Sequence, residues 1–258
     1  MQLPSLSAIL AVASRQYIVW KKLIVSALVT NVANPILFLF AFGFGLGRFI
    51  DTMQGISYMS FVVPGMIAYG AAFAASFETT IGSFSRYHMQ HNWDAVLSTP
   101  VTLTELLLGE ALWASIKAMI SAVAVLIVGW LWGGIPSIGG ALLALPVVFI
   151  AALCFSCVGL AATSYAKGYE FFSYFFTFWV TPMFVFCGVF FEIARFPDFI
   201  QTIAWLLPMT HLVAIIRPLS AELPIDIATI VLHVSYMIAL AVLAFLVALR
   251  RMRHRMFD

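Results

Sequence analysis

The chain has 258 residues, of which 63% are hydrophobic and only 9% are charged, and its mean hydropathy is +1.05. A soluble globular domain carries about 25% charged residues. This composition therefore excludes a soluble fold and predicts that lipid surrounds most of the chain. The net charge of +2 is too small to indicate a nucleic-acid partner.

Residues 1–22 are predicted to form an amphipathic interfacial helix. Its basic residues lie mainly off the apolar face, which recurs at helical spacing and consists of Leu6, Ile9, Leu10, Ala13, Tyr17 and Trp20. We expect this helix to rest in the cytoplasmic interface, with its aromatic rings at headgroup level. A simple N-terminal extension of the first membrane span is the alternative.

Six runs of about 20 apolar residues predict an all-α integral membrane protein with six transmembrane helices. The runs cover residues 23–46, 58–84, 103–132, 141–165, 171–191 and 227–249. Nine basic residues fall on one side, namely Arg15, Lys21, Lys22, Arg86, Lys167, Arg250, Arg251, Arg253 and Arg255. Only three fall on the other, namely Arg48, Arg195 and Arg217. Because cytoplasmic loops are rich in Lys and Arg, we expect both termini in the cytoplasm.

The external segment 192–224 is too broken by Pro197, Pro208 and Pro218 to form one span. It still contains apolar pieces of about half a span each. Backbone that neither spans nor is fully hydrated is tolerated where it is buried in protein or lines a cavity. We therefore expect short re-entrant helices here, with a flat external loop as the alternative.

A polar island separates the second and third spans, and it reads RYHMQHNWDAVLSTPVTLTE from Arg86 to Glu105. It is amphipathic, and the distribution of basic residues predicts that it lies on the cytoplasmic side. A loop of this kind in a membrane protein is a natural contact for a soluble partner. The island is therefore the candidate docking segment of the chain.

Little in the sequence indicates catalysis or metal binding. The phosphate-binding pattern G-x-x-x-x-G-K-[ST] is absent. His88 and His91 are three residues apart, but no carboxylate or cysteine completes a metal site, so none is expected. His211 and His233 are isolated in the sequence, and ordinary hydrogen bonding is the default for both. We expect this chain to bind no cofactor and to be no enzyme itself.

Three charged residues fall within the predicted spans, namely Glu78, Glu110 and Lys117. Each costs about 2.5–3.5 kcal/mol at the membrane centre on insertion scales, so they should face protein or water. Glu110 and Lys117 are seven residues apart and share one helix face. They form either a polar vestibule or gate, or an interhelical ion pair that holds the bundle together.

The fifth span is aromatic on nearly every face. One face is a candidate path for a lipid tail or a sugar ring, with Tyr174, Phe175 and Phe178 as its residues. Lipid contact and anchoring at the interface account for most of the other aromatic side chains.

Four sequence blocks, in this order of elements, resemble the membrane subunit of ABC-2 type ATP-binding-cassette exporters. They are SYMSFVVPGMIAY (Ser57–Tyr69), ETTIGSFSRYHMQHNWDAVLSTPVT (Glu78–Thr102), LLGEALWASIKA (Leu107–Ala118) and TPMFVFCGVFF with LPMTHLVAIIRP (Thr181–Pro218). More closely, they resemble the NodJ-like permeases, which are related to export of lipo-chitooligosaccharide nodulation signals. The resemblance covers almost the whole chain.

The resemblance implies that residues 23–258 form an ABC-2 transmembrane domain and that two permease copies pair around a central path. Two separate ATPase subunits, which hold ATP and Mg, would dock beneath them. Residues 86–100 would be the coupling helix, with ATPase contacts from Arg86, His88, His91, Trp93, Asp94 and Pro100. In this picture Trp93 anchors the contact in a pocket of the ATPase. An external lid would contain Phe190, Phe191, Pro197, Trp205 and Pro208.

The expected function is that of a permease subunit of an exporter in the bacterial cytoplasmic (inner) membrane. Its cargo would be amphiphilic or lipid-linked: a lipooligosaccharide, a polysaccharide or a hydrophobic small molecule. The alternative is an ion- or proton-coupled secondary transporter that uses Glu78, Glu110 and Lys117 as relays. A membrane-embedded enzyme has the least support, because no catalytic constellation is present. Import and export both agree with the sequence.

Overall fold

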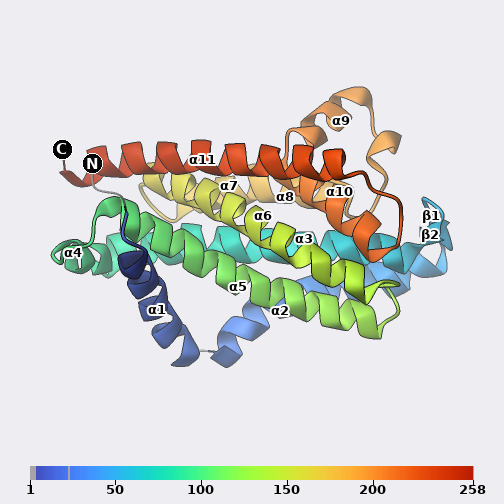
Figure 1. Ribbon diagram of the computed structural model, residues 1–258, viewed down its shortest axis with the longest axis horizontal. Helices are drawn as coiled ribbons and strands as arrows, with labels where there is room; N and C mark the ends of the chain where they lie inside the picture. The colour runs from blue at the N-terminus through green and yellow to red at the C-terminus, as the bar shows by residue number, and fades with distance from the viewer. Residues whose placement is uncertain (1–3, 23, 258) are drawn as a thin grey trace.

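The computed structural model describes residues 4–22 and 24–257 and consists of helices with one short hairpin (Figure 1). The first half contains α1 (Leu6–Lys22), α2 (Ile24–Phe40), β1 (Thr52–Met53), β2 (Ile56–Ser57), α3 (Tyr58–Phe77), α4 (Asn92–Leu97) and α5 (Leu103–Leu131). The second half contains α6 (Ile138–Tyr165), α7 (Glu170–Phe175), α8 (Thr181–Phe186), α9 (Asp198–Trp205), α10 (Pro208–Ser220) and α11 (Ile227–Phe257).

Short turns of other helix types extend several of these elements. The π-helical turns are η1 (Ala41–Gly45), η3 (Glu78–Gly82), η4 (Ser85–Met89) and η5 (Phe176–Val180), and the 3-10 turns are η2 (Leu46–Arg48) and η6 (Ile193–Arg195). Through η3 and η4, the helix that begins as α3 continues to Met89. π-Helical turns inside longer helices often mark functional positions.

Four described helices are long and apolar enough to cross a membrane, namely Tyr58–Met89, Leu103–Leu131, Ile138–Tyr165 and Ile227–Phe257. The predicted first and fifth spans correspond to shorter apolar helices, Ala33–Arg48 and Glu170–Phe186. The all-α membrane fold is thus confirmed. α9 and α10 meet at 85°, so the segment after the fifth predicted span forms two short helices rather than a flat loop.

Polar side chains fix where several helices begin. Thr102 and Glu105 form a reciprocal capping box at the start of α5. Ser57 accepts a hydrogen bond from the backbone N–H of Ser60 at the start of α3, and Ser137 caps α6 in the same manner. The capping residue Ser137 explains why α6 begins three residues before the predicted boundary at residue 141.

α3 forms the centre of the bundle and is buried on nearly every face. Within its most apolar window 89% of the residues are buried, against 17% for α11. The buried side chains of α3 are largely small, which lets α2, α5, α6 and α10 pack closely around it. α11 packs on α6 and leaves most of its own surface uncovered within this single chain.

Glycine permits two of the closest helix contacts. A Cβ atom on Gly109 of α5 would lie 2.6 Å from Cβ of Val12, so α1 rests against α5 where that glycine stands. A Cβ atom on Gly159 of α6 would lie 2.1 Å from Oγ1 of Thr79. These approaches position α1 and α6 against the helices that carry the charged residues.

The bundle has two distinct ends (Figure 1). Both chain termini and α4 lie at one end, which we call the terminal end. The β1–β2 hairpin, α9 and the start of α11 lie at the other, which we call the hairpin end. α1 lies at the terminal end, and its direction differs from that of α2. That α1 rests in the membrane interface stays a prediction.

Candidate functional site

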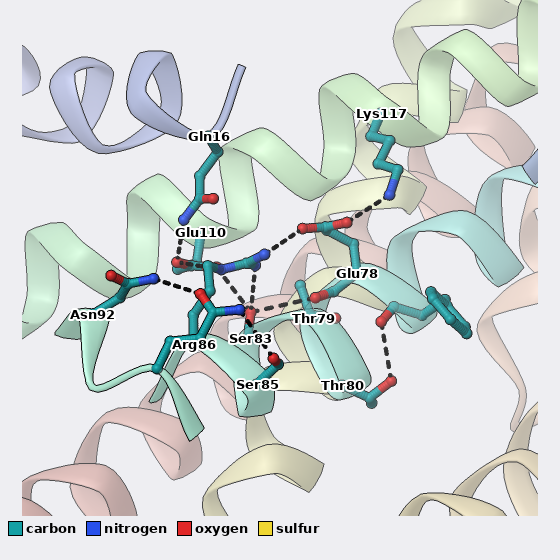
Figure 2. A network of polar contacts seen from close by, with 12 residues as sticks. Gln16, Glu78, Thr79, Thr80, Ser83, Ser85, Arg86, Asn92, Glu110 and Lys117 are labelled. Carbon is teal, nitrogen blue, oxygen red and sulfur yellow. Dashed lines mark hydrogen bonds and ion pairs between the residues drawn. The ribbon is translucent and has the colours of Figure 1, made fainter. Parts of the chain in front are cut away.

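A buried network of charges lies near the terminal end, where α1, α4, η3, η4 and α5 meet (Figure 2). Its centre is Glu110, which is 0% exposed. The Glu110 carboxylate accepts hydrogen bonds from Gln16 Nε2 at 2.8 Å and Ser83 Oγ at 2.8 Å. It also accepts one from Trp93 Nε1 at 3.3 Å. One carboxylate therefore joins side chains from four separate elements.

Arg86 links this carboxylate to a second one. Its Nη2 lies 2.5 Å from Glu110 Oε2, and its Nη1 lies 2.7 Å from Glu78 Oε1. The other Glu78 oxygen, Oε2, pairs with Lys117 Nζ at 2.6 Å. The four charges thus alternate in sign along one chain of contacts and sum to zero (Figure 2).

The pairing explains how these charges are tolerated. A buried ion pair is strongly destabilised when one partner is removed, because an uncompensated charge then stays buried. Here the Glu78 carboxylate has two cationic partners, and the Glu110 carboxylate has one cationic partner and further hydrogen bonds. Interhelical ion pairs are present, as one of the two interpretations expects, and Arg86 bridges Glu78 and Glu110. A role of these charges in a vestibule or gate stays a prediction.

The π-helical turns place these side chains. η3 begins at Glu78 and η4 contains Arg86, so the two ion-pair partners are eight positions apart along a helix that is partly π-helical. Gly82 leaves room between them, since a Cβ atom there would lie 3.3 Å from Arg86 Nη1 and 3.2 Å from Glu78 Oε1. The departure from α-helical geometry thus builds the site.

Two predicted contacts with an ATPase need correction. Trp93 is 1% exposed and points inward to Glu110 and to the ring of Tyr87, 5.4 Å between centroids. It cannot anchor in a pocket of a partner in this arrangement. Arg86 is likewise not a surface residue of the island, because its guanidinium forms ion pairs with the carboxylates of Glu78 and Glu110 inside the bundle. The helix of the island begins at Asn92 rather than at Arg86.

The other predicted contact residues, His88, His91, Asp94 and Pro100, do lie on the surface at the terminal end. His91 has a left-handed backbone, φ 50°, and its Nδ1 lies 3.0 Å from Asp94 Oδ2. His88 stacks on Phe84 with ring centroids 5.0 Å apart. Pro100 is exposed beyond the end of α4. These residues are accessible to a partner, whereas Trp93 and Arg86 connect them to the bundle.

An open groove of about 450 Å³ runs between α1 and α4 at this end. Small and apolar side chains line it, and Arg15 and Asn92 add polar groups; the rest are Ala11, Val12, Ala95, Val96, Thr99 and Val101. The sequence did not indicate it, because α1 and α4 are about 80 residues apart.

The candidate path residues lie on the outside of the single chain. Tyr174 is 64% and Phe178 is 75% exposed, one helical turn apart, while Phe175 turns toward the core and packs on it. The structure therefore brings Tyr174 and Phe178 together on one surface and separates Phe175 from them. Nothing within this chain covers that surface among the described residues.

The predicted lid residues are distributed over the hairpin end. Phe190 is buried, with its ring centroid 4.1 Å from that of Phe42, whereas Phe191 and Trp205 are 40% and 45% exposed. Pro197 immediately precedes α9, and Pro208 is the first residue of α10. The two prolines thus begin the two helices of the bent pair, consistent with the preference of proline for the first helical turn.

Sequence reasoning missed two features at the hairpin end. His211 and His233 are in contact, with their Nδ1 atoms 2.8 Å apart. The other ring nitrogen of His211, Nε2, lies 2.9 Å from the Trp205 carbonyl oxygen. Arg217, which was counted as an external loop charge, is 8% exposed and directed into the bundle. The only usable signal was that His211 and Arg217 both lie within one apolar segment, LPMTHLVAIIRP.

Comparisons with known proteins agree with this architecture. The family model described as ABC-2 type transporter matches residues 7–219. Nodulation protein J of Sinorhizobium fredii is 33% identical over 249 residues, covering 96% of this chain and 94% of that protein. Nodulation protein J of Rhizobium leguminosarum bv. viciae is 36% identical over 247 residues, with 96% and 94% covered.

A less similar relative is named as a transport permease. Inner membrane transport permease YadH of Escherichia coli is 27% identical over 190 residues, covering 74% of this chain and 73% of that protein. The family match includes the charged network, the island and the bent helix pair. With its membrane-length helices and its full-length relatives, this chain belongs to the family of ABC-2 type transporters, as a membrane permease rather than an ATPase.

Proposed function

We propose that this chain is the permease subunit of an ABC exporter that moves an amphiphilic or lipid-linked substrate across the bacterial inner membrane. A separate ATPase subunit, which binds ATP and Mg, would drive it from the terminal end, with both chain termini in the cytoplasm. The observation that carries the proposal is the Trp93–Glu110 contact, which attaches the surface helix α4 to the buried charge network.

The contact supports a mechanism for transmitting force. An ATPase that binds the exposed face of α4 and the groove beside α1 would move both elements when ATP closes it. Gln16 of α1 and Trp93 of α4 bond the same carboxylate, so motion of either element reaches Glu110. From Glu110 the ion pairs continue through Arg86 and Glu78 to Lys117 on the membrane-spanning helix α5.

A second copy of the permease would complete the transport path. Tyr174 and Phe178 form an uncovered aromatic surface, and α11 also leaves most of its apolar surface uncovered. Large exposed apolar patches are expected on a membrane protein, so lipid can cover part of this area. We propose that the aromatic surface of Tyr174 and Phe178 faces the partner copy and the cargo between them.

Co-reconstitution with the presumed ATPase tests the proposal. The chain and the ATPase are placed in proteoliposomes, and ATP hydrolysis and uptake of labelled lipid-linked saccharides and hydrophobic amines are measured. The proposal expects ATP-dependent uptake of an amphiphile. Trp93→Phe keeps the ring and removes the N–H donor, so hydrolysis should persist while uptake per ATP falls several-fold. The matched control is Trp130→Phe, which changes a half-exposed tryptophan of the same helix bundle.

Two results would contradict the proposal. If Trp93→Phe transports with unchanged uptake per ATP, the contact to Glu110 does not transmit the motion. If the chain transports without any ATPase but responds to a proton gradient, the alternative of secondary transport is correct. That alternative has less support, because Glu78 and Glu110, the two carboxylates that it uses as relays, already have cationic partners.

A further inference from the structure

An open groove follows α5 on the side that faces α1. Its first part has a volume of about 310 Å³ and lies between the two helices, lined by Leu10, Ala13, Ser14 and Tyr17 of α1 and by residues of α5 that include Trp113 and Ile116. The second part has a volume of about 480 Å³, and its described lining comes from α5, between Ile116 and Ile127. Ile116 lines both parts, so they form one continuous surface, which we call the α1–α5 groove.

The second part of the groove is an uncharged stripe along one face of α5. Its lining residues recur at intervals of three and four positions, which keeps them on one side of the helix. Lys117, the charged residue next to Ile116, is directed to Glu78 at 2.6 Å and leaves the stripe apolar. From Ile116 to Ile127 the helix advances about 16 Å. One leaflet holds about 15 Å of hydrocarbon, half of the membrane core, so the stripe matches the length of a single acyl chain.

Three aromatic rings gather where the groove passes between the two helices. The ring centroid of Trp113 lies 6.2 Å from that of Tyr17 and 5.8 Å from that of Trp20. The rings of Tyr17 and Trp20 are 6.3 Å apart. Tyrosine and tryptophan are enriched at membrane–water interfaces, where their rings lie at the level of the headgroups. We therefore expect lipid headgroups beside α1 and hydrocarbon from Ile116 onward.

The charge at this end of the groove is positive. Lys21 follows Tyr17 by four positions and Ser14 by seven, so it continues the face of α1 that lines the groove. Lys22 is about 100° further around the helix. α1 contains no Asp or Glu, and no ion pair within residues 4–22 and 24–257 includes Lys21 or Lys22. An anion at the headgroup level therefore meets unpaired ammonium groups and no carboxylate of α1.

We propose that the α1–α5 groove binds one anionic phospholipid as a resident lipid rather than as cargo. Its phosphate lies at Lys21, its glycerol region lies beside Tyr17 and Trp113, and one acyl chain follows α5 from Ile116 to Ile127. The positive charge selects the headgroup, and the length of the stripe selects the chain. The inference goes beyond the proposed function and depends neither on an ATPase nor on what is transported.

Lipid binding to the full chain tests this site. The purified protein in a non-ionic detergent is titrated with phosphatidylglycerol or with phosphatidylcholine of the same acyl chains, and native mass spectrometry measures the affinity for the first bound lipid. We expect phosphatidylglycerol to bind at least about tenfold more tightly, a difference of about 1.4 kcal/mol. For the location, phosphatidylglycerol with a diazirine in one acyl chain is added to nanodiscs of phosphatidylcholine. After irradiation, the labelled residues should concentrate between Ile116 and Ile127.

Variants make the result specific to the groove. Lys21→Gln should weaken phosphatidylglycerol binding about fivefold, which corresponds to about 1 kcal/mol, and should leave phosphatidylcholine binding unchanged. Lys22→Gln makes the same change off the groove face and should weaken binding less than about twofold. Ala124→Leu adds bulk to the stripe and should lower the labelling of α5 several-fold. Its control is Ala239→Leu at an exposed position of α11, which should leave the labelling of α5 unchanged.

Three outcomes would overturn the inference. Equal affinity for the two lipids would remove the selection by charge. Equal losses in Lys21→Gln and Lys22→Gln would show a diffuse attraction to basic residues instead of a site. Labelling spread evenly over the exposed apolar helices, or absent from α5 because a second copy covers the groove, would remove the acyl chain. Since these measurements contain neither ATP nor an ATPase, their failure leaves the proposed transport function standing.

Discussion

The two ends of this bundle hold buried charge in opposite ways. At the terminal end, Glu78, Arg86, Glu110 and Lys117 satisfy one another through three ion pairs. At the hairpin end, Arg217 is held by two backbone carbonyls and an aromatic ring, and no carboxylate pairs with it among the described residues. Charges that are all paired with one another hold their helices together and can transmit a displacement from one helix to the next. A cation without a charged partner still has N–H donors that can bond a ligand.

The largest expected effect is the loss of the central carboxylate. Glu110→Ala leaves Arg86 with one partner and leaves the Gln16 and Trp93 donors unsatisfied. We expect the free energy of unfolding to fall by about 3–5 kcal/mol, measured by SDS-induced unfolding in mixed micelles. The control on the same helix is Glu105→Ala, which removes a helix cap and should cost about 1 kcal/mol. Equal losses in the free energy of unfolding would show that the charge network stabilises the fold no more than a single helix cap does.

A smaller effect is expected at the other end. Arg217→Met keeps an unbranched chain over the Phe61 ring, removes a buried charge, and leaves the carbonyl oxygens of Phe61 and Gly188 without that donor. The cost should be about 1–3 kcal/mol in the same unfolding measurement. A loss as large as that of Glu110→Ala would contradict the contrast between the two ends and would make Arg217 mainly structural.

The smallest effect concerns the contact between α4 and the network. A double-mutant cycle of Trp93→Phe with Glu110→Ala should give an interaction energy of about 1 kcal/mol, because each single change removes the one hydrogen bond that the pair shares. The cycle of Trp130→Phe with Glu110→Ala pairs distant sites and should be additive. Additivity in both cycles would remove Trp93 from the network.

Much of the fold follows from composition and spacing. Long apolar runs give the spans, and the prolines at 197, 208 and 218 divide the segment that forms α9 and α10. The burial of Glu78 and Glu110 follows from the cost of charge in lipid. The family resemblance gave the correct family.

The partners of the charges could not be read from the sequence. Arg86 belongs by spacing to a polar loop, and only the π-helical turns η3 and η4 carry the helix far enough to bury it. Trp93 looks like a surface anchor in a polar island, yet its N–H reaches a carboxylate 17 residues away. In the sequence Arg217 is one of three external basic residues, whereas in the structure α10 packs on α3 and Arg217 Nε donates to the Phe61 carbonyl oxygen. Such pairings depend on helix packing between distant segments.

The histidine contact at the hairpin end fixes where protons must be. A carbonyl oxygen only accepts, so His211 Nε2 carries a hydrogen toward Trp205. Between the two Nδ1 atoms there is room for one hydrogen, so at most one of the two rings is positively charged. The elbow of α9 and α10 is thus attached to α11 through the hydrogen bond between the two rings and through the Tyr236 hydroxyl, which donates to the Leu206 carbonyl oxygen at 2.6 Å. The nitrogen-15 shifts of the two imidazoles would show which ring holds the hydrogen between the two Nδ1 atoms.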